Sequence, residues 1–500
     1  MTIDRRLRRN ALTAAVLALW AAMLLEVVRR QRAAAPGDAV PLEEAAPSEA
    51  GQAPVERDEW FDVRHEGHKV GWAHRVLERD GDSGWRMRED SSFSLAMLGA
   101  PQTVRSSIRA RTDGAFALRD FEFGIVSPAM RFRANGTTDG RKLHVTYGAE
   151  GRESKADFDL AEPIHLPATL RPRVIAGKHA AGTRITSTVF SPLTMRNEPM
   201  TIVVEGRETI DGRSGKVETT RLVEEHQGAK ARAWIADDGS VLREEGTLGF
   251  MMERSDAASA RTGIEHDHPP DLALESRIPF AGEIANPRGL DRLEVVVRGD
   301  AADLVLSSPP RQLREGPLLR VTRERIPDPS PDRPIVAAPP EVADALDPSP
   351  FVESDDPAIV GLARSVVGGE KDAAVAARKL LEWVNDHMTQ APSLTIPSAR
   401  EALRERRGDC NEHAVLLAAL GRAAGIPSRV AAGAMYADGA FLYHAWTEFW
   451  LGSWVSADAV FRQMPVDATH VKLVEGGPEH HGELARIIGR LDFAPAGGGT

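Results

Sequence analysis

The 500-residue sequence contains a single cysteine, Cys410. One cysteine cannot form an internal disulfide, so cysteine usage does not reveal the redox compartment of the protein. A lone cysteine is most often a small, buried, apolar residue. Only the residues around Cys410 can therefore indicate whether its thiol has a chemical role.

Beyond its amino terminus the chain also lacks an excess of positive charge. The net charge is −11, and the first 32 residues carry seven arginines against Asp4 and Glu26, a charge of +5 that leaves −16 for the remainder. A domain that binds nucleic acid is expected to be basic, so we predict no nucleic-acid partner. The composition, 42% hydrophobic and 27% charged, is that of folded domains, and the length suggests about three of them.

Recognisable metal-binding patterns are absent from the sequence as well. His266 and His268 lie in a segment rich in Asp and Pro with no third ligand nearby. Cys410 and His413 would need two further nitrogen or sulfur ligands to form a structural zinc site. We therefore predict neither a metal nor a cofactor.

Only one long apolar run occurs, at residues 11–28, between two groups of arginines. Its length is just sufficient to cross the hydrocarbon core of a bilayer. We predict that residues 1–32 form a membrane anchor, with a signal peptide cut near residues 33–35 and a soluble amphipathic helix as alternatives. Either of the first two would place the rest of the chain in the periplasm or at the cell surface of a bacterium, anchored or, after cleavage, as an exported soluble protein.

The next part of the chain changes from unpatterned to alternating sequence. Residues 33–55 are rich in Ala, Pro and Glu without periodicity and are predicted to be a disordered tether. Residues 56–268 contain short alternating runs separated by turn pairs such as Asp113-Gly114, which predict antiparallel strands. Runs of this number and length predict a curved sheet, a half-barrel or a sandwich. Its concave face is a candidate site for a peptide or a lipid, although a spacer that positions another domain is the simpler interpretation.

Three further boundaries follow along the chain. Residues 269–326 are predicted to form a small β unit, with strands near residues 290–297 and 318–321. Eight prolines between Pro327 and Pro350 predict a linker, because proline removes backbone donors from helices and sheets. We predict a further folded domain at residues 351–480 and a carboxy-terminal tail at 481–500.

Helix signals surround the cysteine. Asp356-Pro357 predicts a helix start, apolar residues at spacings of three and four predict a helix over 372–388, and Ser398 with Glu401 has the form of a capping box. Asp409 is a favourable N-cap residue, which would place Cys410 in the first turn of a helix that ends near residue 424. The N–H groups and positive dipole end of that helix are expected to lower the pKa of the thiol and to be available to an oxyanion.

Three strands are predicted after this helix, at residues 429–436, 441–451 and 454–461. His444 lies on the second strand and Asp458 on the third. With an odd-numbered loop or a bulge at residues 451–453, the two side chains become diagonal neighbours on one face of the sheet. A two-residue loop would place them on opposite faces, so we predict the odd loop or bulge.

Four segments, spaced along the carboxy-terminal part of the chain, together resemble the motifs of a known family. They are residues 407–414 (RGDCNEHA), 424–430 (AGIPSRV), 444–448 (HAWTE) and 454–458 (WVSAD). In this order the segments resemble the transglutaminase-like cysteine enzymes of the papain-like superfamily, over about residues 356–476. The resemblance implies that Cys410 is the nucleophile, that His444 acts as general base and then acid, and that Asp458 orients the imidazole.

The chain departs from this family at two points. Ala459 follows Asp458 where family members commonly have proline, and no side chain that would assist an oxyanion is identifiable. No calcium site of the kind used by animal transglutaminases is visible, so calcium dependence is not implied.

The predicted fold class is therefore α+β, with an N-terminal membrane helix, an antiparallel β-rich middle region and a C-terminal papain-like, transglutaminase-like α+β domain. The predicted function is acyl transfer on peptide amides of a protein or peptide substrate through a thioester on Cys410, with hydrolysis slightly favoured over crosslinking. The alternative is a non-catalytic envelope binding or scaffold protein with a vestigial triad, and a structural zinc protein is a third hypothesis.

Overall fold

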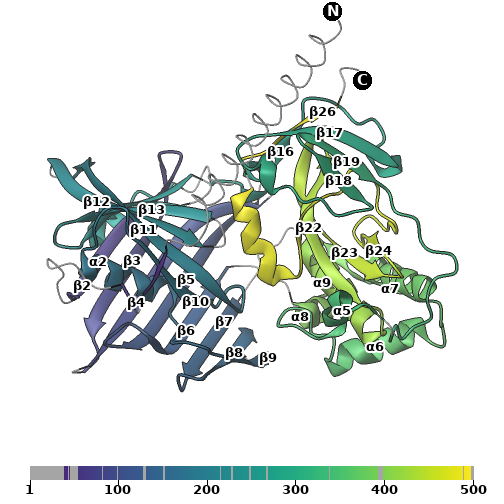
Figure 1. The fold of residues 1–500 in the computed structure, drawn as a ribbon, viewed down its shortest axis with the longest axis horizontal. Helices are drawn as coiled ribbons and strands as arrows, with labels where there is room; N and C mark the ends of the chain where they lie inside the picture. Colours follow the sequence, from purple (N-terminus) through teal and green to yellow (C-terminus); the bar gives the residue numbers. More distant parts are fainter. Residues whose placement is uncertain are drawn as a thin grey trace, which may run out of the picture.

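The computed structural model describes residues 39–496 except 43, 46–53, 82, 98–99, 128–130, 150–151, 214, 227–228, 247–248, 266–268, 337, 392–397 and 488. The described chain forms two regions, a curved β region and a mixed α+β region (Figure 1). A short helix, η5 (Pro478–Arg486), lies between them, and Arg196 of the β region approaches His480 of this helix with its Nη1 3.0 Å from the ring Nδ1.

One sheet of fifteen strands makes the β region. Its strands in chain order are β1 (Val40–Pro41), β2 (Arg57–His65), β3 (His68–Arg79), β4 (Gly84–Met97), β5 (Ala100–Asp113), β6 (Leu118–Val126), β7 (Arg131–Thr138), β8 (Lys142–Ala149), β9 (Arg152–Asp159), β10 (Arg184–Ser191), β11 (Arg196–Gly212), β12 (Gly215–His226), β13 (Ala229–Ala236), β14 (Val241–Glu245) and β15 (Phe250–Ser255). Their order across the sheet is β1-β10-β11-β12-β13-β14-β15-β2-β3-β4-β5-β6-β7-β8-β9. Two antiparallel meanders, β2–β9 and β10–β15, thus meet where β15 pairs with β2, and β1 pairs parallel with β10 at one edge.

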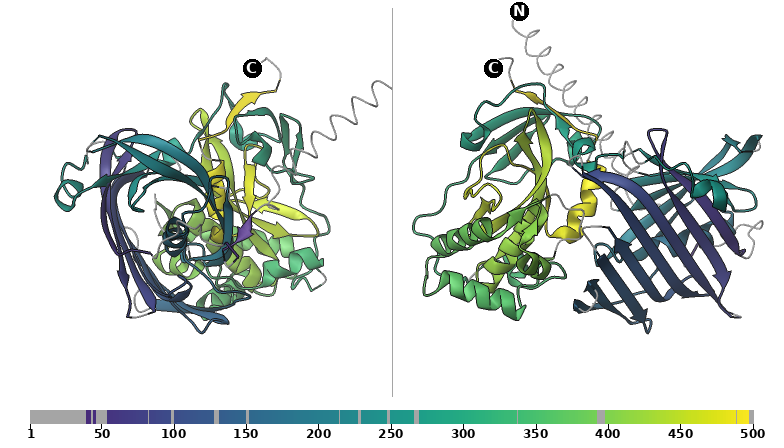
Figure 2. Two further views of the ribbon diagram at one scale, coloured as in Figure 1. Left: turned by 60° about the vertical axis from the view of Figure 1, so that its left-hand side comes forward. Right: turned by 180° about the vertical axis from the view of Figure 1, so that it is seen from behind.

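The alternation of the strands explains which face of this sheet is buried. In β2, for example, Phe61 and Val63 are buried while their neighbours are partly exposed, because successive side chains point to opposite faces. The sheet curves around helix α2 (Pro167–Gly177), as Figure 2 shows. Leu170 and Val174 of α2 pack in one core with Phe61 and Val63. A sheet this large must curl to bury its apolar face.

Buried charges lie between α2 and the sheet. Arg171 of α2 donates hydrogen bonds to Glu224 and Glu244, and Arg75 Nη1 donates to Glu244 over 2.8 Å. These groups, with apolar residues such as Leu77 and Ile175, line a cavity of about 280 Å³.

The α+β region contains the remaining main elements. Its helices are α6 (Pro357–Val367), α7 (Ala373–His387), α8 (Ala399–Glu405) and α9 (Cys410–Ala423), and its strands are β16 (Ile278–Pro279), β17 (Arg292–Arg298), β18 (Gln312–Glu315), β19 (Leu318–Thr322), β20 (Thr389–Gln390), β21 (Arg407–Gly408), β22 (Ser428–Ala437), β23 (Ala440–Trp450), β24 (Trp454–Ala457), β25 (Val471–Glu475) and β26 (Asp492–Pro495). Short helices α3 (Ala257–Ala260), α4 (Leu272–Glu275), η2 (Pro287–Gly289), η3 (Ala302–Leu304), α5 (Pro340–Ala343) and η4 (Asp344–Leu346) occupy connections. Helix α9 packs its buried residues between α6, α7, α8 and the sheet β16-β23-β22-β25, with β24 paired to β23.

The predicted fold class needs correction. Across the described ranges, no helix combines the length and apolar character that a bilayer crossing requires, and residues 1–32, on which the membrane-helix prediction rested, lie outside the described residues. The sheet of fifteen strands is mixed, because β1, from residues 33–55, pairs parallel with β10, whereas β15 and β2 of the middle region pair antiparallel, as predicted. Its first strand, β1, falls within residues 33–55, which we predicted to be a disordered tether. Part of this segment is ordered instead, because its backbone pairs with β10.

The small β unit and the end of the chain join the α+β region. Strands β17, β18 and β19 form a sheet with β26, which comes from the predicted tail at 481–500. Val295, Leu319 and Phe493 of this sheet share one core with Leu473 of β25. The proline-rich segment 327–350 also packs on this region, since the N–H of Ile335 donates to the Gly425 carbonyl over 2.9 Å.

Candidate active site

The start of α9 presents the only cysteine. Asp409 caps the helix: its Oδ1 accepts the Asn411 N–H over 2.7 Å, and Glu412 Oε2 accepts the Asp409 N–H over 2.8 Å. This capping box satisfies backbone N–H groups that a helix start leaves unpaired. Cys410 is therefore the first residue of the helix, as predicted.

Strand β23 lies directly against this helix start. The backbone N–H of Ala445 donates to the Cys410 sulfur, and the Thr447 hydroxyl donates to the Ala414 carbonyl one turn further along α9 over 2.9 Å. The sulfur thus contacts the backbone of the residue that follows His444.

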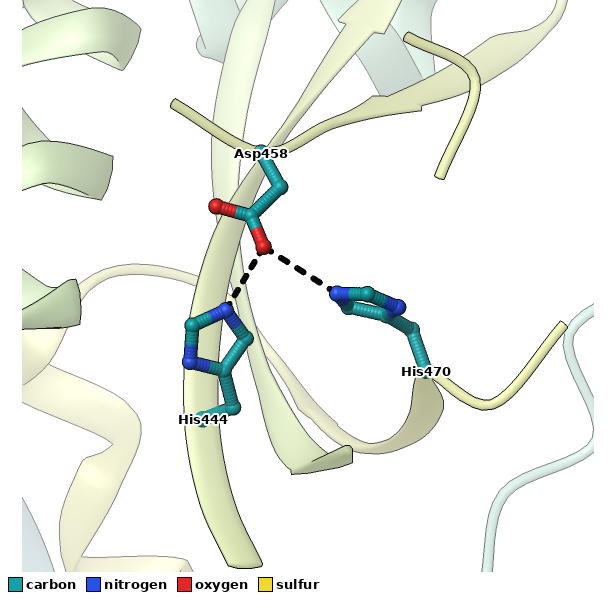
Figure 3. A group of neighbouring side chains, drawn as sticks. All are labelled: His444, Asp458 and His470. Atoms are coloured by element: carbon teal, nitrogen blue, oxygen red, sulfur yellow. Dashed lines mark hydrogen bonds and ion pairs between the residues drawn. The ribbon is translucent and has the colours of Figure 1, made fainter. Parts of the chain in front are cut away.

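The turn between β23 and β24 sets the position of the aspartate. Trp450 pairs with Trp454, so residues 451–453 form a three-residue loop, with Gly452 at φ +93°. The predicted odd loop is confirmed, and it makes Asp458 a diagonal neighbour of His444. His444 Nε2 donates to Asp458 Oδ2 over 2.8 Å (Figure 3).

A second histidine, His470, joins this pair. Its Nε2 lies 3.1 Å from the same Oδ2 of Asp458 (Figure 3). The other oxygen, Oδ1, accepts the Val460 N–H over 2.8 Å. His444, Asp458 and His470 are all buried. No sequence motif marks His470, and only the fold of residues 459–470 returns it to Asp458.

The two imidazoles determine the charge of the carboxylate between them. Burial opposes ionisation of Asp458, but His444 and His470 outweigh it and hold the pKa of Asp458 far below its ordinary value. Burial likewise opposes the charge of His470, yet its contacts with Asp458 and Asp467 raise the pKa of His470. Asp458 is therefore an anion at neutral pH.

The predicted acidity of the cysteine is wrong. Although the Cys410 side chain keeps some solvent contact, the surrounding protein and the carboxylates of Asp409, Glu412 and Asp458 raise its pKa well above the ordinary thiol value, and the Ala445 N–H offsets this only in part. The helix start alone favours a lower pKa, but the flanking carboxylates and the packing of β23 outweigh it.

Two neighbouring side chains complete the surroundings. His413 places Nδ1 2.6 Å from the Asp409 carbonyl, and burial lowers its pKa, so it remains a neutral packing residue. The Tyr443 hydroxyl donates to Asn411 Oδ1 over 2.8 Å. Phe461, 39% exposed, packs against His444 with ring centroids 5.6 Å apart and forms an apolar wall beside it.

The same cluster could in principle attract a metal. The ligand atoms of His444, Asp458 and His470 lie within 4.8 Å of one another, and two imidazoles with a carboxylate are a familiar ligand set. Both Nε2 atoms already lie at hydrogen-bond distance from Asp458 Oδ2, however, and metal binding would break both contacts. We therefore assign the cluster as hydrogen-bonded. His266 and His268 lie outside the described residues.

Comparisons with known proteins bear on this part of the chain. Residues 360–459 match the family model of the transglutaminase-like superfamily. No curated protein matches the sequence.

Several solved structures are similar. A candidate cysteine protease from Cytophaga hutchinsonii is 18% identical over 42% of this chain and 82% of its own, with a TM-score of 0.29. A β-barrel-like protein with a domain of unknown function from Brucella abortus is 12% identical over 41% of this chain and 99% of its own, with a TM-score of 0.32. A candidate protease from Parabacteroides distasonis is 12% identical over 68% of each chain, with a TM-score of 0.18.

Proposed function

The chain contains a transglutaminase-like domain at residues 360–459, and from this premise we propose that it is a cysteine enzyme that transfers the acyl group of peptide amides through a thioester. The observation that carries the proposal is the buried hydrogen bond between His444 and Asp458, beside a cysteine at a helix start. Asp458 holds His444 through Nε2, which leaves Nδ1 as the nitrogen that exchanges a proton with the thiol.

The reaction follows from these three groups. The Cys410 sulfur attacks the amide carbonyl while His444 accepts the thiol proton. The C–N bond then breaks, His444 returns this proton to the leaving amine, and a thioester remains on Cys410. Water or a second amine attacks the thioester, gives its proton to His444 and releases the acyl group, and the proton finally returns to sulfur.

The raised pKa of Cys410 explains why a base is needed. The resting thiol is protonated at neutral pH, so the nucleophile forms only as His444 removes the proton during attack. We propose that a backbone N–H group at the start of α9 supports the developing oxyanion and that Phe461, which is partly exposed, offers an apolar surface to a substrate side chain. Hydrolysis of a protein or peptide substrate is slightly favoured over crosslinking.

A comparison of products tests this function. A bacterial envelope extract is incubated with the wild type, Cys410→Ala or His444→Ala, and new peptide N-termini and new isopeptide bonds are counted by mass spectrometry. We expect new N-termini with the wild type only, and new isopeptide bonds instead if an amine is the acceptor. His144→Ala, an exposed histidine beside Asp157 in the β region, is the control that should keep full activity.

The outcome that contradicts the enzyme is an identical product list from the wild type and Cys410→Ala. The second candidate function is a non-catalytic binding protein with a vestigial triad. One observation favours it: burial raises the pKa of Cys410, and buried thiols of this kind are typically inert.

Two other proposals concern the rest of the chain. Export to the periplasm or cell surface stays a prediction, since it rests on residues 1–32. Binding of a peptide or lipid by the concave face of the β region also stays a prediction, and the cavity of about 280 Å³ beside α2 supports it.

A further inference from the structure

Four side chains form one continuous buried series that extends past the predicted triad. His444 contacts Asp458, Asp458 contacts His470, and His470 Nδ1 lies 3.4 Å from Asp467 Oδ1, an ion-pair distance without hydrogen-bond alignment. Asp458, Asp467 and His470 are at most 1% exposed. Burial this complete strengthens every charge interaction within the series.

Carboxylates flank both nitrogens of His470. A neutral imidazole carries one N–H and can donate to one partner, whereas an imidazolium can donate to both. Asp467 is itself anchored, since its Oδ1 accepts the Thr469 N–H over 2.9 Å and its Oδ2 lies 2.9 Å from Arg288 Nη1. The arrangement therefore favours His470 as a cation between two anions.

We propose that His470 is a positioning residue of the site, which holds the Asp458 carboxylate through the same oxygen that His444 contacts and, as its partner cation, keeps His444 in the neutral form that can accept a proton. The inference rests on the proposed function, because it assigns His444 the role of base.

His470 affects the protonation of His444 because the two imidazoles compete for one oxygen of Asp458. Asp458 Oδ2 is shared by both imidazoles. A positive charge on His470 offsets the negative charge that would otherwise stabilise a protonated His444. Removal of that cation should therefore raise the pH at which His444 loses its proton. The titratable and charged groups around the two rings are Asp458, Asp467, Arg288, Arg311, Cys410 and His413.

The test is a titration of His444 by ¹H–¹⁵N NMR of histidine-labelled full-length protein. All variants carry Cys410→Ala, so that no thiol titration is coupled to the imidazole. His470→Gln keeps an N–H donor toward Asp458 but removes the charge. We expect the His444 midpoint to move upward by at least half a pH unit relative to the parent, and His144→Gln to leave it unchanged.

A second variant keeps the test decisive if His470→Gln does not fold. Asp467→Asn keeps an oxygen for the Thr469 N–H but removes one of the two anions that favour charged His470. The His444 midpoint should rise again, by a smaller amount. An unchanged midpoint in a folded variant, judged by an unchanged thermal melt, overturns the proposal and leaves His470 a packing residue.

Failure of this inference is separate from failure of the proposed function. The titration uses protein without the nucleophile and reports only how His470 affects His444. The product comparison between the wild type and Cys410→Ala reports only whether the site is catalytic.

Discussion

At the scale of single residues, the start of α9 combines two opposing effects on one thiol. The helix end and the Ala445 N–H favour a thiolate, whereas burial and the carboxylate of Asp409 disfavour it. Asp409 is itself affected: burial and the nearby Glu412 raise its pKa well above the ordinary value. Asp409, the N-cap of α9, therefore also raises the pKa of the neighbouring Cys410.

Asp409→Asn should separate these two roles. Asparagine caps helices about as well as aspartate, so the variant should fold normally, but loss of the charge should lower the pH midpoint of Cys410 alkylation by iodoacetamide. The midpoint in the wild type should lie above about 8.5, the value of a free thiol.

The matched control is Asp356→Asn, which changes the N-cap of α6 and should leave alkylation of Cys410 unaltered. An Asp409→Asn midpoint equal to that of the wild type would show that the Asp409 charge does not reach the thiol.

At the scale of elements, buried ion pairs attach helix α2 to the sheet. Glu244 of β14 accepts hydrogen bonds from Arg171 of α2 and from Arg75 of β3. Burial opposes its charge, but the two arginines lower the pKa of Glu244 to about 2. Because its folded-state pKa lies below the unfolded value, this carboxylate contributes stability above about pH 4.5 and loses it as the pH falls toward 2.

Glu244→Gln should accordingly lower the free energy of unfolding of the β region by about 3 kcal/mol at pH 7. Urea unfolding followed by circular dichroism should show this difference at pH 7 and a smaller one at pH 3.5. Glu122→Gln is the control, because Glu122 is exposed and 3.7 Å from Arg109, and exposed pairs contribute about 0–1 kcal/mol. A difference independent of pH would exclude the carboxylate charge as the cause.

At the scale of the whole molecule, Phe351 connects the two regions. Its side chain is buried in the β-region core, with its ring edge-on to Tyr147 at 6.4 Å between centroids, while its carbonyl accepts the Ala399 N–H at the start of α8 over 3.0 Å. The Tyr147 hydroxyl donates to the Pro350 carbonyl over 3.2 Å, and Arg400 Nη2 donates to Ser154 Oγ over 2.9 Å. The β region and the α+β region thus share a packed contact at the end of the proline-rich segment.

Phe351→Ala should weaken this contact. A buried phenylalanine replaced by alanine costs about 3–5 kcal/mol, so we expect a lower melting temperature in calorimetry and a separation of the transitions of the two regions. Val336→Ala truncates a side chain that is 89% exposed and should leave the melt unchanged. If Phe351→Ala melts like the wild type, the regions are not coupled through this residue.

The helix caps and the tight loop of the site were predictable from short stretches of contiguous sequence. The caps at Asp356, Asp372 and Asp409, and the three-residue loop around Gly452, depend on hydrogen bonds and turn conformations within a few residues. The sequence itself therefore determined that Cys410 begins a helix and that His444 and Asp458 share one face of a sheet.

The tertiary structure decided what depends on distant residues. The contact of His470 with Asp458, the joining of β26 to β17 and the edge pairing of β1 with β10 bring together segments that no local pattern links. The raised pKa of Cys410 has the same origin, because desolvation and charge depend on every group packed around the sulfur. Hydrogen bonds between near neighbours are encoded in short stretches, whereas burial is a property of the folded chain as a whole.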